Sequence, residues 1–251
     1  MSAASSPTAP SLPGGDATLP RDLRMLAYWI SLAAAAGGLG GALVGGIGGR
    51  LAMFLLRLTS DDSIRGLESD DGFIMGRFDL TATLSLGLVT TVMGSILGLV
   101  MAFGRPFFPK RGMPFAWALA GALLGGSLLI SADGVDFTLL EPHWFAVLLF
   151  VLVPALGALA IASLIEVYHR FWWRHRPGTA VASVAAIPAL IFFPIGIATA
   201  VVAGAWLLAL RTQEGRVFAA WLPARVAALV VFAVLVGLGT MGLVGDVRAI
   251  L

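Results

Sequence analysis

The chain has 251 residues, of which 59% are hydrophobic and only 12% are charged. A soluble domain carries about 25% charged residues, so most of this protein's surface is expected to face lipid. A net charge of +2 provides no basic face of the kind that a nucleic-acid-binding protein needs. The absence of cysteine excludes disulfides and thiolate metal sites. Composition therefore predicts an integral membrane protein whose main partner is the lipid bilayer.

Residues 1–22 are rich in Ser, Pro, Ala and Thr and show no apolar period. Because they cannot bury enough surface to offset their ordering entropy, we expect a disordered cytoplasmic tail. A cleaved signal peptide is the alternative, since Arg21 and Arg24 precede an apolar run. That run continues to Gly49, well past the roughly 7–15 residues of a signal core, which favours an uncleaved first span. Residues 23–251 are predicted to form one transmembrane helical domain.

Six apolar stretches are long enough to cross a membrane. A bilayer core about 30 Å thick needs about 20 helical residues. Backbone in lipid must satisfy its own hydrogen bonds, and unbroken apolar runs of this length indicate helices rather than the short alternating strands of a barrel. The sequence therefore predicts an all-α, polytopic transmembrane helical bundle. The predicted spans are 25–49, 80–104, 113–132, 144–165, 188–210 and 227–245.

The stretch 178–210 is too long for one span and contains Pro188 and Pro194. Proline removes a helical hydrogen bond and clashes with the preceding turn. We expect an interfacial piece followed by one kinked span. The alternative is a pair of half-helices that leave and return on the same side. That alternative would place three further basic residues in the cytoplasm: Arg211, Arg216 and Arg225.

The predicted orientation follows from the distribution of Lys and Arg, which are in excess in cytoplasmic loops. With a cytoplasmic N-terminus, the inside segments carry nine basic residues and the outside segments carry six. We therefore predict a multi-pass protein with its N-terminus inside and with loops 57–79 and 133–143 outside. The abundance of Arg, Ala and Gly indicates a GC-rich bacterial genome, and hence the cytoplasmic (inner) membrane of a bacterium.

The first predicted span carries a stripe of glycines at strict four-residue spacing: Gly37, Gly41, Gly45 and Gly49. Since lipid tails are as apolar as leucine, helix interfaces in membranes depend on small residues that permit close backbone approach. The stripe predicts close packing against another helix. That helix belongs either to the same chain or to a second subunit of a homo-oligomer or larger membrane complex.

A glycine-containing hexapeptide occurs twice. Gly41-Ala-Leu-Val-Gly-Gly46 recurs as Gly121-Ala-Leu-Leu-Gly-Gly126, and Ser69–Gly72 is echoed by Ser131–Gly134. The echo would pair the first two spans with the next two as parallel hairpins. In a chain with 31 Gly, chance matches are also easy, so duplication and coincidence both stay open.

Loops 57–79 and 133–143 hold nine of the fourteen acidic residues. Carboxylates bind hard cations, so the predicted metal ligands are Asp70, Asp71, Asp133 and Asp136. The spacing of a calcium-binding loop is missing from both segments. The alternative is a pair of solvated loops in which Asp caps helices. We predict no other cofactor.

Basic and aromatic side chains alternate directly after the fourth predicted span: Arg170, Trp172, Trp173, Arg174 and Arg176. Such a run at a cytoplasmic boundary suits anionic lipid headgroups, at about 1 kcal/mol per basic residue. It predicts a headgroup anchor that either selects anionic lipids or only fixes orientation.

The sequence lacks HExxH, GxSxG, a Walker loop, and a GxGxxG that follows a predicted strand. The predicted spans also lack interior Asp, Glu, Lys and His, which proton-coupled and charge-coupled transporters place there. We therefore predict no enzyme but an accessory or structural subunit, or a small oligomer, that acts through helix packing. The alternative is a channel or facilitator for an uncharged solute, lined by hydroxyls: Thr90, Thr91, Ser95 and Ser127. A dry, glycine-packed core would favour the first function, and a continuous polar cavity the second.

Overall fold

The computed structural model describes residues 19–61, 66, 79–108, 112–175 and 201–251, the last range without 203, 207, 210 and 211. Every regular element within these ranges is a helix. Four of the described helices are long and apolar enough to cross a membrane, and one shorter helix is also apolar. The long helices are Tyr28–Thr59, Leu80–Gly104, His143–Arg170 and Leu222–Ile250, and the shorter one is Met113–Leu129. The prediction of an all-α polytopic bundle is confirmed.

The first span is continuous and consists of α1 (Leu19–Gly40), the π-helical segment η1 (Gly41–Gly48) and α2 (Gly49–Thr59). The predicted end at Gly49 was too early. Arg50 follows that position, but a further apolar turn comes after it and the helix continues to Thr59. Segments of π-helix are rare and are usually only one turn long.

Helix α3 (Leu80–Gly104) has the predicted bounds. It begins where the Asp79 carboxylate accepts hydrogen bonds from the Thr81 N–H (2.8 Å) and the Ala82 N–H (3.3 Å), which satisfies free donors of the first turn. Beyond α3 the chain reverses at Gly112, whose φ of 86° is in the left-handed region that glycine adopts without strain.

A second helical pair follows. Its first member consists of α4 (Met113–Ala120), the π-helical segment η3 (Gly121–Gly125) and α5 (Gly126–Leu129). The short α6 (Val135–Leu139) leads into α7 (His143–His175). Helix α7 continues past the predicted end at residue 165 because Glu166, which ends the apolar run, forms an ion pair with Arg105 and does not break the helix.

The C-terminal part contains α10 (Gln213–Ala220) and α11 (Leu222–Ile250). Helix α11 packs on η3 and α5 through two positions. A Cβ on Gly239 would lie 3.1 Å from the Leu123 carbonyl oxygen, and one on Gly126 would lie 3.4 Å from the Leu243 side chain. Most other apolar residues of α11 are exposed. Most of the predicted span 188–210 falls outside the described residues.

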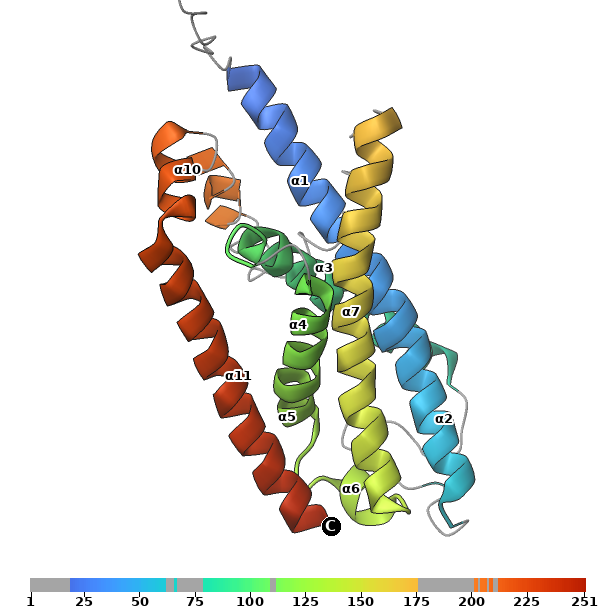
Figure 1. Cartoon of the computed structure of the whole chain (residues 1–251). Helices are drawn as coiled ribbons and strands as arrows, with labels where there is room; N and C mark the ends of the chain where they lie inside the picture. Colours follow the sequence, from blue (N-terminus) through green and yellow to red (C-terminus); the bar gives the residue numbers. More distant parts are fainter. Residues whose placement is uncertain are drawn as a thin grey trace, which may run out of the picture.

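The helix ends gather at two ends of the bundle. Helix α1 begins, α7 ends, and α10 and α11 begin at one of them (Figure 1). The end of α2, α6 and the C-terminus lie at the other (Figure 1). The chain between α7 and α10 therefore starts and finishes at the same end. Residues 176–200, on which the two alternatives for this stretch depend, lie outside the described residues.

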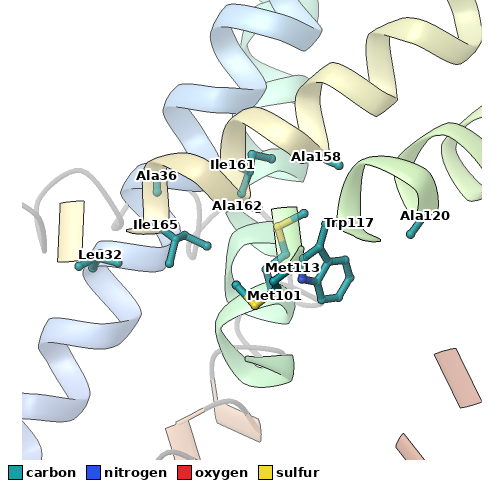
Figure 2. Close-up of a cluster of buried hydrophobic side chains, with 10 residues drawn as sticks. All are labelled: Leu32, Ala36, Met101, Met113, Trp117, Ala120, Ala158, Ile161, Ala162 and Ile165. Carbon is teal, nitrogen blue, oxygen red and sulfur yellow. The ribbon is translucent and has the colours of Figure 1, made fainter. Parts of the chain in front are cut away.

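The core is apolar and lies where α1, α3, α4 and α7 meet (Figure 2). Trp117 is 7% exposed and packs edge-on against Phe232 of α11, with ring centroids 5.4 Å apart. Among the described residues, only Ser31 and Ser95 are buried polar side chains. The cluster consists of Leu32, Ala36, Met101, Met113, Trp117, Ala120, Ala158, Ile161, Ala162 and Ile165.

Candidate functional site

The glycine stripe faces α3, and we call this contact seam one. A Cβ added to Gly37 would overlap the Gly94 carbonyl, and one on Gly41 would overlap the Thr90 carbonyl. A Cβ on Gly45 would lie 2.8 Å from the Thr90 Cβ. At Gly49, by contrast, the nearest atom is the Leu86 Cδ2 at 3.9 Å, an ordinary van der Waals contact. Three of the four stripe positions thus lie against another helix of the same chain.

The facing helix also contributes glycines to seam one. A Cβ on Gly94 would overlap the Gly37 carbonyl, and one on Gly98 would overlap the Ala33 carbonyl. Carbonyl oxygens of each helix therefore lie where side chains of the other would begin. This arrangement favours weak Cα–H···O contacts and close dispersion contacts, which contribute to helix association in lipid.

The four hydroxyls that could line a solute path lie within hydrogen-bond distance of backbone carbonyls. Each reaches a carbonyl on its own helix, and Ser95 also lies 3.0 Å from the Ala34 oxygen of α1. The bonds within a helix are Thr90 to Leu86 O (2.8 Å), Thr91 to Gly87 O (2.5 Å), Ser95 to Thr91 O (2.9 Å) and Ser127 to Leu124 O (3.0 Å). The backbone therefore already accepts the hydroxyl protons that a facilitator would donate to a solute.

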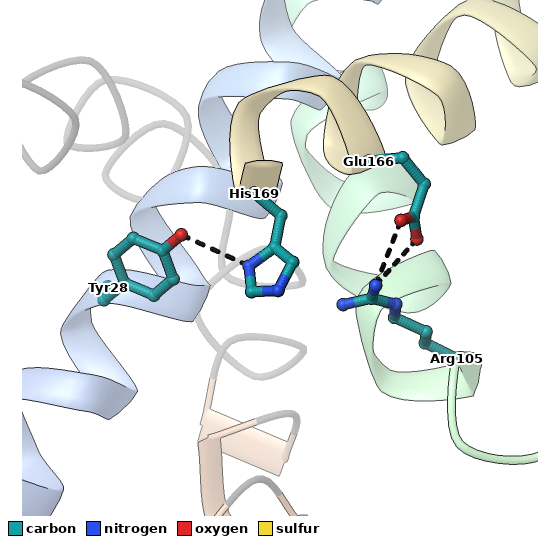
Figure 3. A network of polar contacts seen from close by, with 4 residues as sticks. All are labelled: Tyr28, Arg105, Glu166 and His169. Atoms are coloured by element: carbon teal, nitrogen blue, oxygen red, sulfur yellow. Dashed lines mark hydrogen bonds and ion pairs between the residues drawn. The ribbon is translucent and has the colours of Figure 1, made fainter. Parts of the chain in front are cut away.

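Five side chains form a polar and aromatic cluster where α1, the end of α3 and α7 meet, and we call it the polar clamp. Figure 3 shows all of its members except Trp29. The Arg105 Nη2 lies 2.9 Å and 3.1 Å from the two Glu166 carboxylate oxygens. The Tyr28 hydroxyl lies 3.3 Å from the His169 Nδ1. The His169 ring stacks on Trp29 at 4.7 Å, and the Arg105 Cζ lies 5.2 Å from a Trp29 ring centroid. The Trp29 ring thus contacts both His169 and Arg105.

The polar clamp can hold three helix ends together. The side chains of Arg105 and Glu166 are 27% and 28% exposed, so their ion pair is partly removed from water. Fully exposed pairs contribute about 0–1 kcal/mol, and partial burial reduces solvent screening of the attraction. The cation–π contact with Trp29 adds about 0.5–1 kcal/mol at partly exposed sites.

Sequence reasoning missed the polar clamp because its charged members fall one residue beyond predicted spans. Arg105 follows the span 80–104, and Glu166 follows the span 144–165. A signal was present: opposite charges stand just past the ends of two spans that finish on the same side of the membrane. Which spans are neighbours in space could not be deduced from that signal.

The structure describes only some of the predicted cation ligands. Asp70 and Asp71 lie outside the described residues, Asp133 is exposed, and Asp136 is in α6 with its side chain outside the description. In the part of the chain that is described, no group of three or more His, Asp or Glu side chains could hold a metal ion. A cation site formed by these acids stays a prediction.

The predicted headgroup anchor is also only partly visible. Arg170 is exposed on α7. Helix α7 includes Trp172, Trp173 and Arg174, but their side chains, like Arg176 as a whole, lie outside the description. The anchor stays a prediction.

Comparisons with protein-family models, with curated proteins and with solved structures find no match for this chain. Its function is therefore argued from the helices, the glycine seam and the polar clamp.

Proposed function

We propose that this chain is a membrane-embedded packing subunit without catalytic activity, which works within a small oligomer or a larger membrane complex. The observation that carries the proposal is the close contact between α1–η1 and α3 along seam one. Glycines face backbone along it, and its hydroxyls are bonded to carbonyls. A protein that works through packing needs such a rigid interior and an apolar exterior that partners can contact.

Helix α11 is the surface that we assign to this packing role. Its outward residues are large and apolar, with Leu238 61% and Met241 75% exposed. Only positions such as Gly239 and Leu243 are buried against the rest of the chain. In a membrane such a helix contacts either lipid or the helix of a neighbouring subunit.

Because the chain contains no cysteine, cross-linking through α11 tests the packing role directly. Met241→Cys in native membranes is expected to form one cross-linked species of defined mass, identified by native mass spectrometry. Leu243→Cys, at a buried position of the same helix, is the matched control and should not cross-link. A protein that stays monomeric with both variants would contradict the proposal.

The alternative function is a channel or facilitator for a small uncharged solute. It is tested by stopped-flow release of glycerol and of urea from proteoliposomes. We expect rates equal to those of protein-free liposomes, since the hydroxyls of Thr90, Thr91 and Ser95 are occupied by backbone. Faster release that is lowered by Ser95→Ala would establish the facilitator instead.

We also propose that the end of the bundle with the polar clamp faces the cytoplasm of a bacterial cell. Since α10 and the start of α11 lie at that end, Arg211, Arg216 and Arg225 join the inside segments and Arg248 joins the outside ones. The count of nine basic residues inside and six outside then becomes eleven and four. This larger bias supports the orientation.

Cysteine labelling tests this orientation. Gln213→Cys, at an exposed position of α10, should react with an impermeant maleimide only from the cytoplasmic side. Asp133→Cys, also exposed, should react only from outside. The reverse pattern would overturn the orientation, and labelling of both positions from one side would overturn the arrangement of α10 relative to α6.

A further inference from the structure

We infer that the two helical hairpins of this chain are tandem copies of one packing unit, and that the polar clamp is the place where the same position of each copy reaches across to the other. Hairpin one consists of α1, η1, α2 and α3, and hairpin two consists of α4, η3, α5 and α7. Matched contacts carry this inference, whereas the hexapeptide repeat alone left coincidence open.

The first helices of the hairpins correspond through their π-helical segments. Segment η1 begins at Gly41 and η3 begins at Gly121, the first residues of the two related hexapeptides, which gives a shift of 80 positions. Because π-helices are rare, two in one chain that start at the same point of the same motif are strong evidence of correspondence.

The second helices of the two hairpins, α3 and α7, can be aligned by the residues that lie against the glycines of each motif. A Cβ on Gly41 would overlap the Thr90 carbonyl oxygen, and one on Gly121 would lie 2.5 Å from the Pro154 carbonyl oxygen. A Cβ on Gly45 would lie 2.8 Å from the side chain of the same Thr90. One on Gly125 would lie 2.5 Å from the side chain of the same Pro154. Thr90 and Pro154 are therefore equivalent, a shift of 64 positions.

A third contact gives the same shift. A Cβ on Gly46 would lie 3.2 Å from the Gly87 Cα, and one on Gly126 would lie 3.2 Å from the Val151 Cγ2. From 87 to 151 is again 64 positions. The difference between the shifts of 80 and 64 is absorbed by the first helix of hairpin two, which ends at Leu129 whereas α2 continues to Thr59, and by the shorter segment that follows it. One register thus explains all three pairs of contacts.

Features that were not used to find the register agree with it. Helix α3 begins at Leu80, whose equivalent is residue 144, and α7 begins at His143. Met101 and its equivalent Ile165 are each 1% exposed and lie in the same core cluster (Figure 2). In this register the first residues of α3 and α7 differ by one position. Equivalent residues of the two helices are also buried in the same core cluster.

The register also pairs the central members of the polar clamp. Arg105 of hairpin one is equivalent to His169 of hairpin two. Arg105 reaches Glu166 of hairpin two, and His169 reaches Tyr28 of hairpin one (Figure 3). Both also contact the Trp29 ring. The same position in each copy thus contacts a residue of the other copy.

An exchange of the two clamp residues in the full chain tests the equivalence. Arg105→His removes the guanidinium from Glu166, and His169→Arg places two guanidinium groups beside Trp29. Each single variant should lower Tm in detergent by about 3–6 °C. The double exchange should return Tm to within about 2 °C of the parent protein, because an arginine at 169 can pair with Glu166 one turn away on the same helix.

The matched control moves the arginine to a position that is not equivalent: Arg105→His combined with Tyr168→Arg. Its Tm loss should equal the sum of the two single losses. Recovery by the Arg105/His169 exchange but not by this control supports the inference. Summed losses in the exchange, or equal recovery in both pairs, would overturn it.

A second test uses the residue that faces the glycine motif, which is Thr90 in hairpin one and Pro154 in hairpin two. It does not involve the polar clamp. Thr90 fits against Gly45, so its equivalent position should accept threonine, and Pro154→Thr should leave Tm unchanged or raise it. A threonine at 154 also restores a backbone N–H inside α7. Pro154→Leu, whose larger side chain would press on Gly121 and Gly125, should lower Tm. Equal losses for the threonine and leucine variants would overturn the equivalence.

Discussion

Seam one carries glycine on both helices, whereas the contact of η3 with α7, which we call seam two, carries glycine on one helix only. In seam one Gly37 and Gly41 lie against backbone carbonyls of α3. In seam two Gly121 lies against the Pro154 carbonyl oxygen and the Ala158 methyl group, and Gly125 lies against the Pro154 ring. The first glycine of the motif thus faces a carbonyl oxygen in both hairpins, but the helix that faces it contributes glycine in seam one and the side chains of Pro154 and Ala158 in seam two.

This difference sets how each seam responds to added volume. An obstructing side chain can be removed by substitution, but a helical carbonyl that accepts its own helix hydrogen bond stays in place unless the whole helix moves. The obstruction at Gly41 is therefore expected to persist whatever side chain stands at position 90, whereas the obstruction at Gly125 can be removed by substituting Pro154. Overpacking typically costs about 1–3 kcal/mol and costs more where the neighbours cannot relax.

The largest expected effect is at Gly41. Gly41→Ala places a Cβ on the Thr90 carbonyl oxygen and should cost about 3 kcal/mol, a Tm loss of about 6–12 °C. Gly41→Leu should prevent recovery of monodisperse protein after extraction. Gly237→Ala is the control, because no atom lies within 4 Å of a Cβ built there. An unchanged Tm for both Gly41 variants would mean that α1–η1 does not pack on α3.

The spans of this protein were accessible from sequence because hydrophobicity over about 20 residues is a local property. The bounds of α3 agree with the prediction because Asp79 caps its start and the apolar run stops at Arg105. The helix that packs against the glycine stripe could not be predicted from the sequence. Small residues indicate a close contact without naming the helix that makes it, and the glycines of α3 look the same in sequence whether or not they face Gly37.

Two features could not be predicted from the sequence, for different physical reasons. The polar clamp depends on which helix ends are neighbours, and this is a property of the packed bundle. The end at which α11 begins depends on how the chain between α7 and α10 runs, and prolines at 188 and 194 permit either a kinked span or a return to the same side. Local sequence limits such choices but does not decide them.

An intermediate loss of Tm is expected for a substitution in seam two, and a second substitution should rescue it. Gly125→Ala brings a Cβ to 2.5 Å from the Pro154 Cβ and 3.1 Å from its Cγ. The expected loss of about 1–2 kcal/mol is partly offset by the better helix propensity of alanine. Adding Pro154→Gly removes the obstructing Cβ together with the ring and should restore Tm.

The matched pair in seam one should show no such rescue. Thr90→Ala leaves the Thr90 carbonyl in place, so it should not restore Tm to Gly41→Ala. Comparison of the two double-mutant cycles by thermal unfolding in one detergent separates the seams. Rescue in both cycles, or in neither, would mean that the two obstructions do not differ in this way.

The smallest expected effect concerns Ser95, whose hydroxyl is positioned to join the helices of seam one. It lies 3.0 Å from the Ala34 carbonyl across the seam and 2.9 Å from the Thr91 carbonyl of its own helix, and it can donate only one proton. If it donates across the seam, Ser95→Ala should cost about 0.6 kcal/mol, the average for interhelical hydrogen bonds in membranes, and Tm should fall by about 1–2 °C. Ser127→Ala is the matched control, since its hydroxyl bonds only the Leu124 carbonyl of its own helical segment. The equivalent of Ser95 in hairpin two is Leu159, which has no hydroxyl, so a larger loss for Ser95→Ala than for Ser127→Ala would identify a polar link specific to seam one. Equal losses would show that Ser95 bonds its own helix and that glycine packing alone holds the seam.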